Sequence, residues 1–214
     1  MDPQTSSSAV TGRLRTRPRA ADSRYLRPLG RFVDAVETLR RNDIPPMQLA
    51  SSVARSLADL IHEPNWLCEE HCQPGGQHYR QHLLHVAPDG GFSVVALVWT
   101  PGQRTPIHDH VAWCVVGVYE GEETETRYQL YGDAGHPFLV ETGVHTGRPG
   151  DTTALVPPDE NIHEVRNDSS RAAISIHVYG ANIAALGSSI HRRFDHVERR
   201  ASPGSDRPGR WRAA

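Results

Sequence analysis

From about residue 65 onward, the sequence consists of short runs rich in Val, Ile, Tyr and Thr that are separated by Gly, Pro and Asp. The clearest pair is 79–86 and 92–99, joined by the turn sequence APDGG. Further runs lie at about 113–119, 123–131, 137–145, 152–156, 163–167 and 172–179. Many short strands without helices between them indicate an antiparallel sandwich or a small β-barrel of the jelly-roll kind.

Two amphipathic helices are predicted before this β-rich part. Apolar residues recur there at three- and four-residue spacing, and Pro45 with Pro46 separates the two stretches. Both ends of the chain are rich in Arg, Ser and Pro and poor in large apolar residues, which favours disordered tails. The predicted parts are a tail (1–27), a single domain (28–198) with helices (28–64) and a barrel (65–190), and a second tail (199–214).

Composition excludes several classes of function. The chain has 214 residues and a formal net charge of -2, and all 23 of its basic residues are arginine. The absence of lysine excludes Schiff-base, pyridoxal-phosphate and Walker-lysine chemistry. The charge argues against a nucleic-acid partner, and no apolar run suggests a membrane segment. Three cysteines form no disulfide framework, so we expect a cytoplasmic protein. We also expect a monomer or small homo-oligomer.

Three histidines have the spacing of metal ligands. His108 and His110 stand two residues apart after a turn, and alternate residues of a strand share one face. Both imidazoles are therefore expected to point the same way. His163 follows a second turn, which contains two prolines. One His-x-His is a weak signal in a chain with 13 histidines, but the two segments together favour a three-histidine metal site.

These segments resemble the two motifs of the cupin superfamily. Four residues stand at the spacing of the first motif: Gly102, His108, His110 and Gly121. Cys114 occupies the place of the usual glutamate in that motif. The second motif is matched by Pro158, His163 and Asn167, with Glu160 where glycine is usual. The resemblance implies the cupin fold, a double-stranded β-helix.

A metal site without a carboxylate favours a particular kind of substrate. Three neutral histidines leave the full charge of a divalent ion to be balanced by an incoming ligand. A thiolate meets this need, because a nearby cation lowers the pKa of a thiol. The site is therefore predicted to take a small thiol.

Ser175, His177 and Tyr179 fall on alternate positions of one predicted strand and so share a face. This pattern is similar to the Ser-x-His-x-Tyr of the thiol dioxygenases, which include cysteine dioxygenase and 3-mercaptopropionate dioxygenase. The resemblance implies a mononuclear non-haem Fe(II) ion on the three histidines, with the Tyr179 hydroxyl beside it and oriented by His177 and Ser175. Another divalent metal, such as nickel, is the alternative.

Cys114 stands near the position at which animal cysteine dioxygenases carry a cysteine cross-linked to their tyrosine, whereas bacterial relatives usually have glycine there. The resemblance implies a thioether between Cys114 and Tyr179. The alternative is that Cys114 is a small buried apolar residue, as a free cysteine usually is.

The resemblance also suggests where the substrate binds. The arginine that holds the carboxylate in cysteine dioxygenases falls on Gln81, with Tyr79 two residues earlier, and Gln is typical of the 3-mercaptopropionate enzymes. Trp99 and Arg80 complete the predicted substrate-binding set. The segment after the tyrosine, where that second group supplies an arginine, has none before Arg192. A carboxylate needs a cation or several donors, and further candidates are Arg104, Arg127 and Arg166.

The predicted function is the addition of O2 to the sulfur of a small thiol, L-cysteine or 3-mercaptopropionate, to give a sulfinate. Two alternatives stay open. In the first alternative, the same scaffold carries out a different oxidation or rearrangement of cysteine or a cysteine-derived metabolite in specialised metabolism. The other alternative is a non-catalytic cupin that binds a metal or a small molecule.

Overall fold

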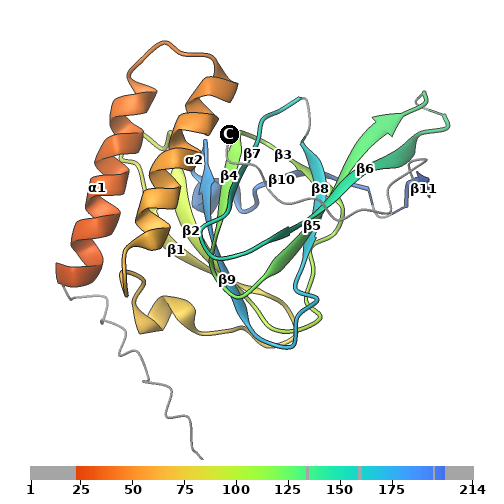
Figure 1. The fold of residues 1–214 in the computed structure, drawn as a ribbon. Coiled ribbons are helices and arrows are strands. Elements are labelled where there is room, and N and C mark those ends of the chain that lie inside the picture. Colours follow the sequence, from red (N-terminus) through yellow and green to blue (C-terminus); the bar gives the residue numbers. More distant parts are fainter. Residues whose placement is uncertain (1–22, 134, 159–160, 195, 201–214) are drawn as a thin grey trace, which may run out of the picture.

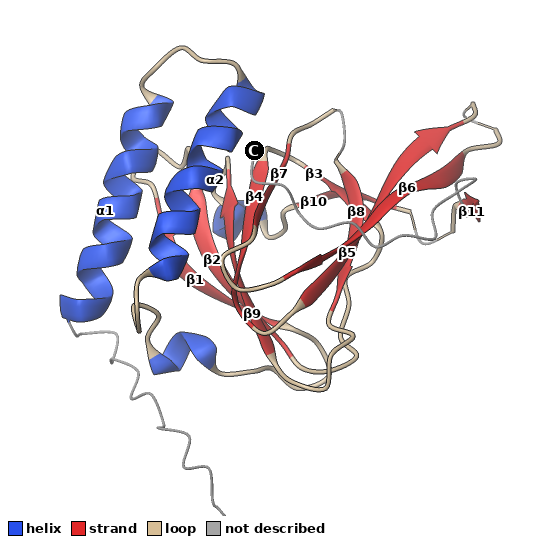
Figure 2. Cartoon of the chain, in the orientation of Figure 1, coloured by secondary structure: helices blue, strands red, loops and turns tan. Residues whose placement is uncertain are grey.

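The structure is a computed structural model that describes residues 23–133, 135–158, 161–194 and 196–200. Helices α1 (Ser23–Arg40) and α2 (Pro46–His62) lie side by side against one sheet of a two-sheet β-structure (Figure 1, Figure 2). The predicted arrangement of two helices before a small β-barrel is confirmed. No helix among the described residues has the length and apolar character needed to cross a membrane.

The two sheets face each other across the interior of the barrel (Figure 2). The first contains, in spatial order, β1 (Arg80–Val86), β2 (Ser93–Trp99), β9 (Ala173–Tyr179), β4 (Cys114–Glu120) and β7 (Thr152–Leu155). The second contains β10 (Ile190–Arg193), β3 (His108–His110), β8 (Ile162–Arg166), β5 (Glu123–Tyr131), β6 (Phe138–Gly147) and β11 (Glu198–Arg200). The short helices are η1 (Glu69–Cys72) and α3 (Ile183–Leu186). This is the predicted double-stranded β-helix.

Both predicted tails overlap described elements. Helix α1 begins at Ser23 and contains Pro28, so it includes the last residues of the predicted tail 1–27. Strand β11 includes residues 199 and 200, because it pairs in parallel with β6, and Arg200 lies over the ring of Phe138 at 4.0 Å. Composition could not reveal that pairing. The rest of the two predicted tails, 1–22 and 201–214, lies outside the described residues.

The first sheet is buried on both faces, and this separates its residues into two cores. On β9, three residues join the apolar core beneath the helices: Ile174, Ile176 and Val178. The alternate residues Ser175, His177 and Tyr179 therefore face the barrel interior. Burial on both faces also explains why β2 is apolar at every position after Ser93 rather than alternating.

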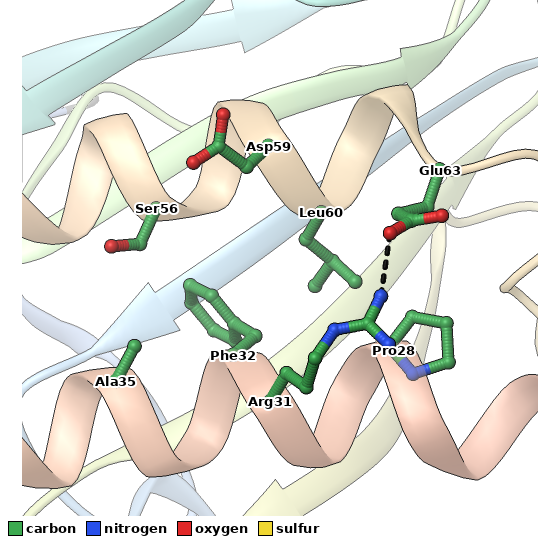
Figure 3. Close-up of a pocket in the computed structure, with 8 residues that line it drawn as sticks. All are labelled: Pro28, Arg31, Phe32, Ala35, Ser56, Asp59, Leu60 and Glu63. Atoms are coloured by element: carbon green, nitrogen blue, oxygen red, sulfur yellow. Dashed lines mark hydrogen bonds and ion pairs between the residues drawn. The ribbon is translucent and has the colours of Figure 1, made fainter.

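The helices form a layer on the outside of this sheet. Phe32 of α1 and Leu60 of α2 point toward each other, and both are buried (Figure 3). At one end of the pocket drawn in Figure 3, Arg31 donates to Glu63 at 2.5 Å. This exposed ion pair contributes little to stability, so the apolar contact holds the two helices together.

Gly117 permits the close approach of α2 to β4. A Cβ atom at this position would overlap Cδ1 of Ile61 and lie 3.0 Å from Cδ2 of Leu57. Leu57 is fully buried and Ile61 nearly so, which leaves little room for either side chain to move. The glycine is therefore required by packing rather than by backbone conformation.

We expect Gly117→Val to lower the free energy of unfolding by about 1–3 kcal/mol, because it overpacks this interface. Urea unfolding would measure the change. The matched control is Gly30→Ala in α1, where a Cβ meets nothing within 4 Å. That variant should gain about 0.5–1 kcal/mol of stability from helix propensity. Equal stability of Gly117→Val and the wild type would contradict this account of the interface.

Candidate metal centre

Three buried histidines converge inside the barrel. His108 and His110 lie on β3, and His163 lies on β8, directly opposite His108 in the antiparallel register. The ligand atoms of the three side chains all lie within 4.8 Å of one another. In the part of the chain that the structure describes, no other group of His, Cys, Asp or Glu side chains comes together in this way.

Each of these rings is held by a hydrogen bond from its Nδ1 atom. The acceptors are the Pro106 carbonyl for His108 at 2.9 Å, Asn161 Oδ1 for His110 at 2.9 Å, and Glu125 Oε1 for His163 at 2.8 Å. Because these oxygens accept, each Nδ1 carries the proton and Nε2 keeps its lone pair. The donor set therefore fits a borderline divalent metal such as iron, nickel or cobalt.

Electrostatics keep the histidines neutral. Burial lowers the pKa of His108 and His163 well below the usual value, and the neighbouring histidines lower both further. Burial also lowers the pKa of His110, although the hydrogen bond to Asn161 opposes this effect. Neutral imidazoles are the form that binds a metal, so the site requires no proton release from these rings near neutral pH.

A carboxylate lies behind His163, and the sequence analysis missed it. Glu125 on β5 is 2% exposed, and its second oxygen accepts from Arg127 Nε at 3.1 Å. Arg127 also donates to Thr153. The metal site lacks a carboxylate ligand but has this carboxylate one hydrogen bond away. The sequence does contain a signal for Glu125. Glu123 and Glu125 alternate along a predicted strand, and a strand in a barrel wall is expected to bury one face.

Ser175, His177 and Tyr179 form a hydrogen-bonded chain beside the histidines. Ser175 Oγ lies 2.9 Å from His177 Nε2, and the Tyr179 hydroxyl lies 3.1 Å from His177 Nδ1. The ring centroids of Tyr179 and His110 are 6.2 Å apart. The end of the chain formed by Tyr179 thus adjoins the three-histidine cluster.

Cys114 lies next to Tyr179, as a directly paired residue of β4 and β9. Burial raises the pKa of the Cys114 thiol well above its usual value, the charge of Glu125 raises it further, and a hydrogen bond with Tyr179 opposes both. The thiol is therefore neutral. The structure places the two side chains together as free groups, and the thioether between them stays a prediction.

The histidines and Tyr179 line a cavity of about 200 Å³. Among the predicted substrate-binding residues, Tyr79, Gln81 and Trp99 line it, and the rings of Tyr79 and Trp99 are 4.4 Å apart. The structure does not place Arg80 in the cavity lining. Arg80 is exposed next to Gln81 on β1, and adjacent residues of a strand point to opposite sides.

Arg193 is a cavity residue that the sequence analysis missed. Of the described residues that line the cavity, it alone carries a positive charge. Its neighbour Arg192 is held on the outside of β3, where its backbone and side chain donate to Asp109 at 2.7 Å each. The other arginine candidates pair elsewhere: Arg104 with Glu164, Arg127 with Glu125, and Arg166 with Asp168.

The fold and this site define a cupin with a buried three-histidine centre. The family model for cysteine dioxygenase type I matches residues 75–195, more than half of the chain. The chain belongs to the cysteine dioxygenase type I family.

Several solved structures are similar to part of this chain. An uncharacterized conserved protein with a double-stranded β-helix domain from Klebsiella pneumoniae is 19% identical, covers 53% of this chain and 87% of its own, and has a TM-score of 0.40. An oxalate oxidase is 21% identical, with 51% of this chain and 56% of its own covered, and a TM-score of 0.40. The cupin domain of an XRE family transcriptional regulator from Enterobacter cloacae is 18% identical, with 48% and 95% covered, and a TM-score of 0.33.

We expect Glu125→Gln to weaken Co(II) binding about 10- to 100-fold, because the amide is a poorer acceptor for the Nδ1 proton of His163. Anaerobic calorimetric titration of the metal-free protein would measure the affinity. The matched control is Glu122→Gln, since Glu122 is half-exposed and pairs with Arg148 at the surface. Equal affinities of both variants would show that the carboxylate does not tune the site.

Proposed function

We propose that this protein is a mononuclear non-haem iron thiol dioxygenase that adds both atoms of O2 to the sulfur of a small thiol to give a sulfinate. The observation that carries the proposal is the arrangement of one small cavity, with three neutral histidines on one wall and Tyr179 on another. His108, His110 and His163 would hold Fe(II), and when bound this ion supplies the redox chemistry that joins sulfur and O2.

Tyr179 is positioned to supply a hydrogen bond inside the cavity. Burial raises the pKa of its hydroxyl well above the usual value, so the group stays protonated. His177 holds the hydroxyl from behind at 3.1 Å, and Ser175 in turn holds His177. A fixed donor aimed at reacting atoms costs no reorganisation during the reaction, which is why such groups contribute strongly to catalysis.

The size of the cavity supports a small substrate. An apolar cavity of roughly 150 Å³ accommodates benzene, a molecule of six non-hydrogen atoms. A cavity of about 200 Å³ therefore suits a thiol of similar size and excludes peptides and nucleotides. Side chains that surround the site, such as Leu97 and Trp99, also limit the entry of water.

Arg193 supports a substrate with a carboxylate. It lies near Tyr79: burial raises the pKa of this tyrosine, and a hydrogen bond with Gln81 and the charge of Arg193 oppose that rise. These three residues would bind the end of the substrate away from the thiol. None of the described residues that line the cavity is acidic, so an ammonium group would have no anionic partner there. This favours 3-mercaptopropionate over L-cysteine.

The test is oxygen uptake by protein reconstituted anaerobically with Fe(II), using 3-mercaptopropionate, L-cysteine and cysteamine. We expect uptake and a product that has gained two oxygen atoms without loss of carbon, fastest with 3-mercaptopropionate. A product with another composition would favour a different oxidation on the same scaffold. Bound iron without consumption of any of the three thiols would contradict the enzyme proposal and favour a binding protein.

We expect Arg193→Gln to raise KM for 3-mercaptopropionate roughly 10- to 100-fold, because a hydrogen bond to a charged group is worth about 1.5–3 kcal/mol. The KM for cysteamine, which has an ammonium group and no carboxylate, should not rise. Steady-state oxygen uptake measures both values. Arg148→Gln, at a surface ion pair with Glu122, is the control and should change neither. Equal effects on the two substrates would overturn the role assigned to Arg193.

A further inference from the structure

A second buried carboxyl group, Glu123, lies behind the Ser175–His177–Tyr179 chain and has no part in the mechanism above. It is 3% exposed and stands two residues before Glu125, so both face the barrel interior from β5. Glu125 has Arg127 and His163 as partners. In the described part of the chain, no ion pair involves Glu123, and its Oε1 atom has no hydrogen-bond partner.

These surroundings favour a neutral carboxylic acid. Burial raises the pKa of Glu123 to about 8, hydrogen bonding with Ser175 and Trp99 opposes this, and the charge of Glu125 adds to it. An ionised carboxylate with an unpaired buried oxygen is costly, whereas the neutral acid is not. The acid then carries an O–H group that needs an acceptor, and Ser175 lies within reach.

The hydrogen bonds around Ser175 allow two arrangements of protons that differ in the charge of Glu123. Trp99 Nε1 can only donate, and it donates to Ser175 Oγ at 3.1 Å. The Ser175 hydroxyl has one proton to give, and both His177 Nε2 and the Glu123 carboxyl compete for it. The protonation state of Glu123 decides which of them accepts.

When Glu123 is neutral, it donates to Ser175, and Ser175 donates to His177 Nε2. His177 then carries its proton on Nδ1 and donates to the Tyr179 oxygen, so the Tyr179 proton turns away from His177 toward the cavity, on the side where Ser189 forms a hydrogen bond with this hydroxyl. When Glu123 is ionised, Ser175 donates to Glu123 and accepts from His177 Nε2. His177 Nδ1 then accepts the Tyr179 proton and withdraws it from the cavity.

We propose that Glu123 is a positioning residue whose acid form sets the tautomer of His177 and so directs the Tyr179 hydroxyl proton into the cavity. Only the effect on turnover rests on the proposed function. The tautomer itself is a property of the protein without metal.

The neighbouring titratable groups do not produce the same switch. Glu125 on its own strand and Tyr179 on β9 interact with Glu123 directly, Ser175 connects it to His177, and Cys114 on β4 lies beside Tyr179. Burial raises the pKa of Tyr179 and of Cys114 well above their usual values, and it lowers the pKa of His177 well below. None of these three therefore changes its charge near pH 8, and Glu125 is already paired with Arg127.

Long-range 1H–15N correlation spectra of the metal-free, 15N-labelled protein would test the proposal. We expect His177 to be the Nδ1–H tautomer below about pH 8, and its Nδ1 and Nε2 shifts to exchange positions as the pH rises to about 9.5. In Glu123→Gln the shifts should stay constant over this range. Glu122→Gln, which changes an exposed carboxylate, should behave as the wild type.

Two more variants make the test independent of whether Glu123→Gln folds. Glu123→Met removes all hydrogen bonding at similar volume, and Ser175→Ala interrupts the chain while Glu123 stays in place; both should lose the pH response. In the Fe(II)-loaded protein, kcat should fall above about pH 8 in the wild type but not in Glu123→Gln, with KM unchanged. A constant His177 tautomer in the wild type, or the same response in Glu123→Gln, would overturn the proposal even if sulfinate is formed.

Discussion

The Nδ1 hydrogen bonds of the three buried histidines are the constraint on which the rest of the site depends. Without them each ring could present either nitrogen, and no common point for a metal would exist. The three acceptors come from the turn before β3, the turn before β8 and the first part of β5. Since these segments meet only when the barrel closes, the metal site and the fold form together, and burial of the rings keeps them neutral until a metal binds.

The two glutamates of β5 show how one strand face can serve two purposes. Glu125 is paired with Arg127 and orients His163, so its charge is balanced within the barrel. Among the described residues no basic side chain pairs with Glu123, which forms a hydrogen bond with Ser175 instead. A carboxyl with a partner acts as an acceptor, and one without a partner holds a proton. The two side chains are chemically identical, but their surroundings give them different roles. Glu125 acts on the metal site, and Glu123 acts on Tyr179.

Much of the fold and the histidine cluster could be predicted because both depend on local periodicity. A period of two identifies strands, and it also places His108 with His110 and Ser175 with His177 and Tyr179 on shared faces. The remainder depends on pairing between distant segments. The local sequence does not show which of Arg192 and Arg193 faces the cavity. The difference arises when β10 pairs with β3 and Arg192 donates to Asp109. The same limit explains why β11 was missed. Arg80 is a different case, because local alternation with Gln81 already places it on the other side of β1.

The histidines and the residues at the far end of the cavity lie in parts of the chain that differ in how well they tolerate substitutions. The histidines and Glu125 lie on paired strands inside the barrel, where a substitution disturbs packing as well as ligation. Arg193 lies on β10, a short edge strand that follows α3 and a turn containing Ser188 and Ser189. Edge segments tolerate changes in length and sequence that a buried strand does not. Substrate choice can therefore change through β10 and the Tyr79–Gln81 segment while the three histidines keep their geometry.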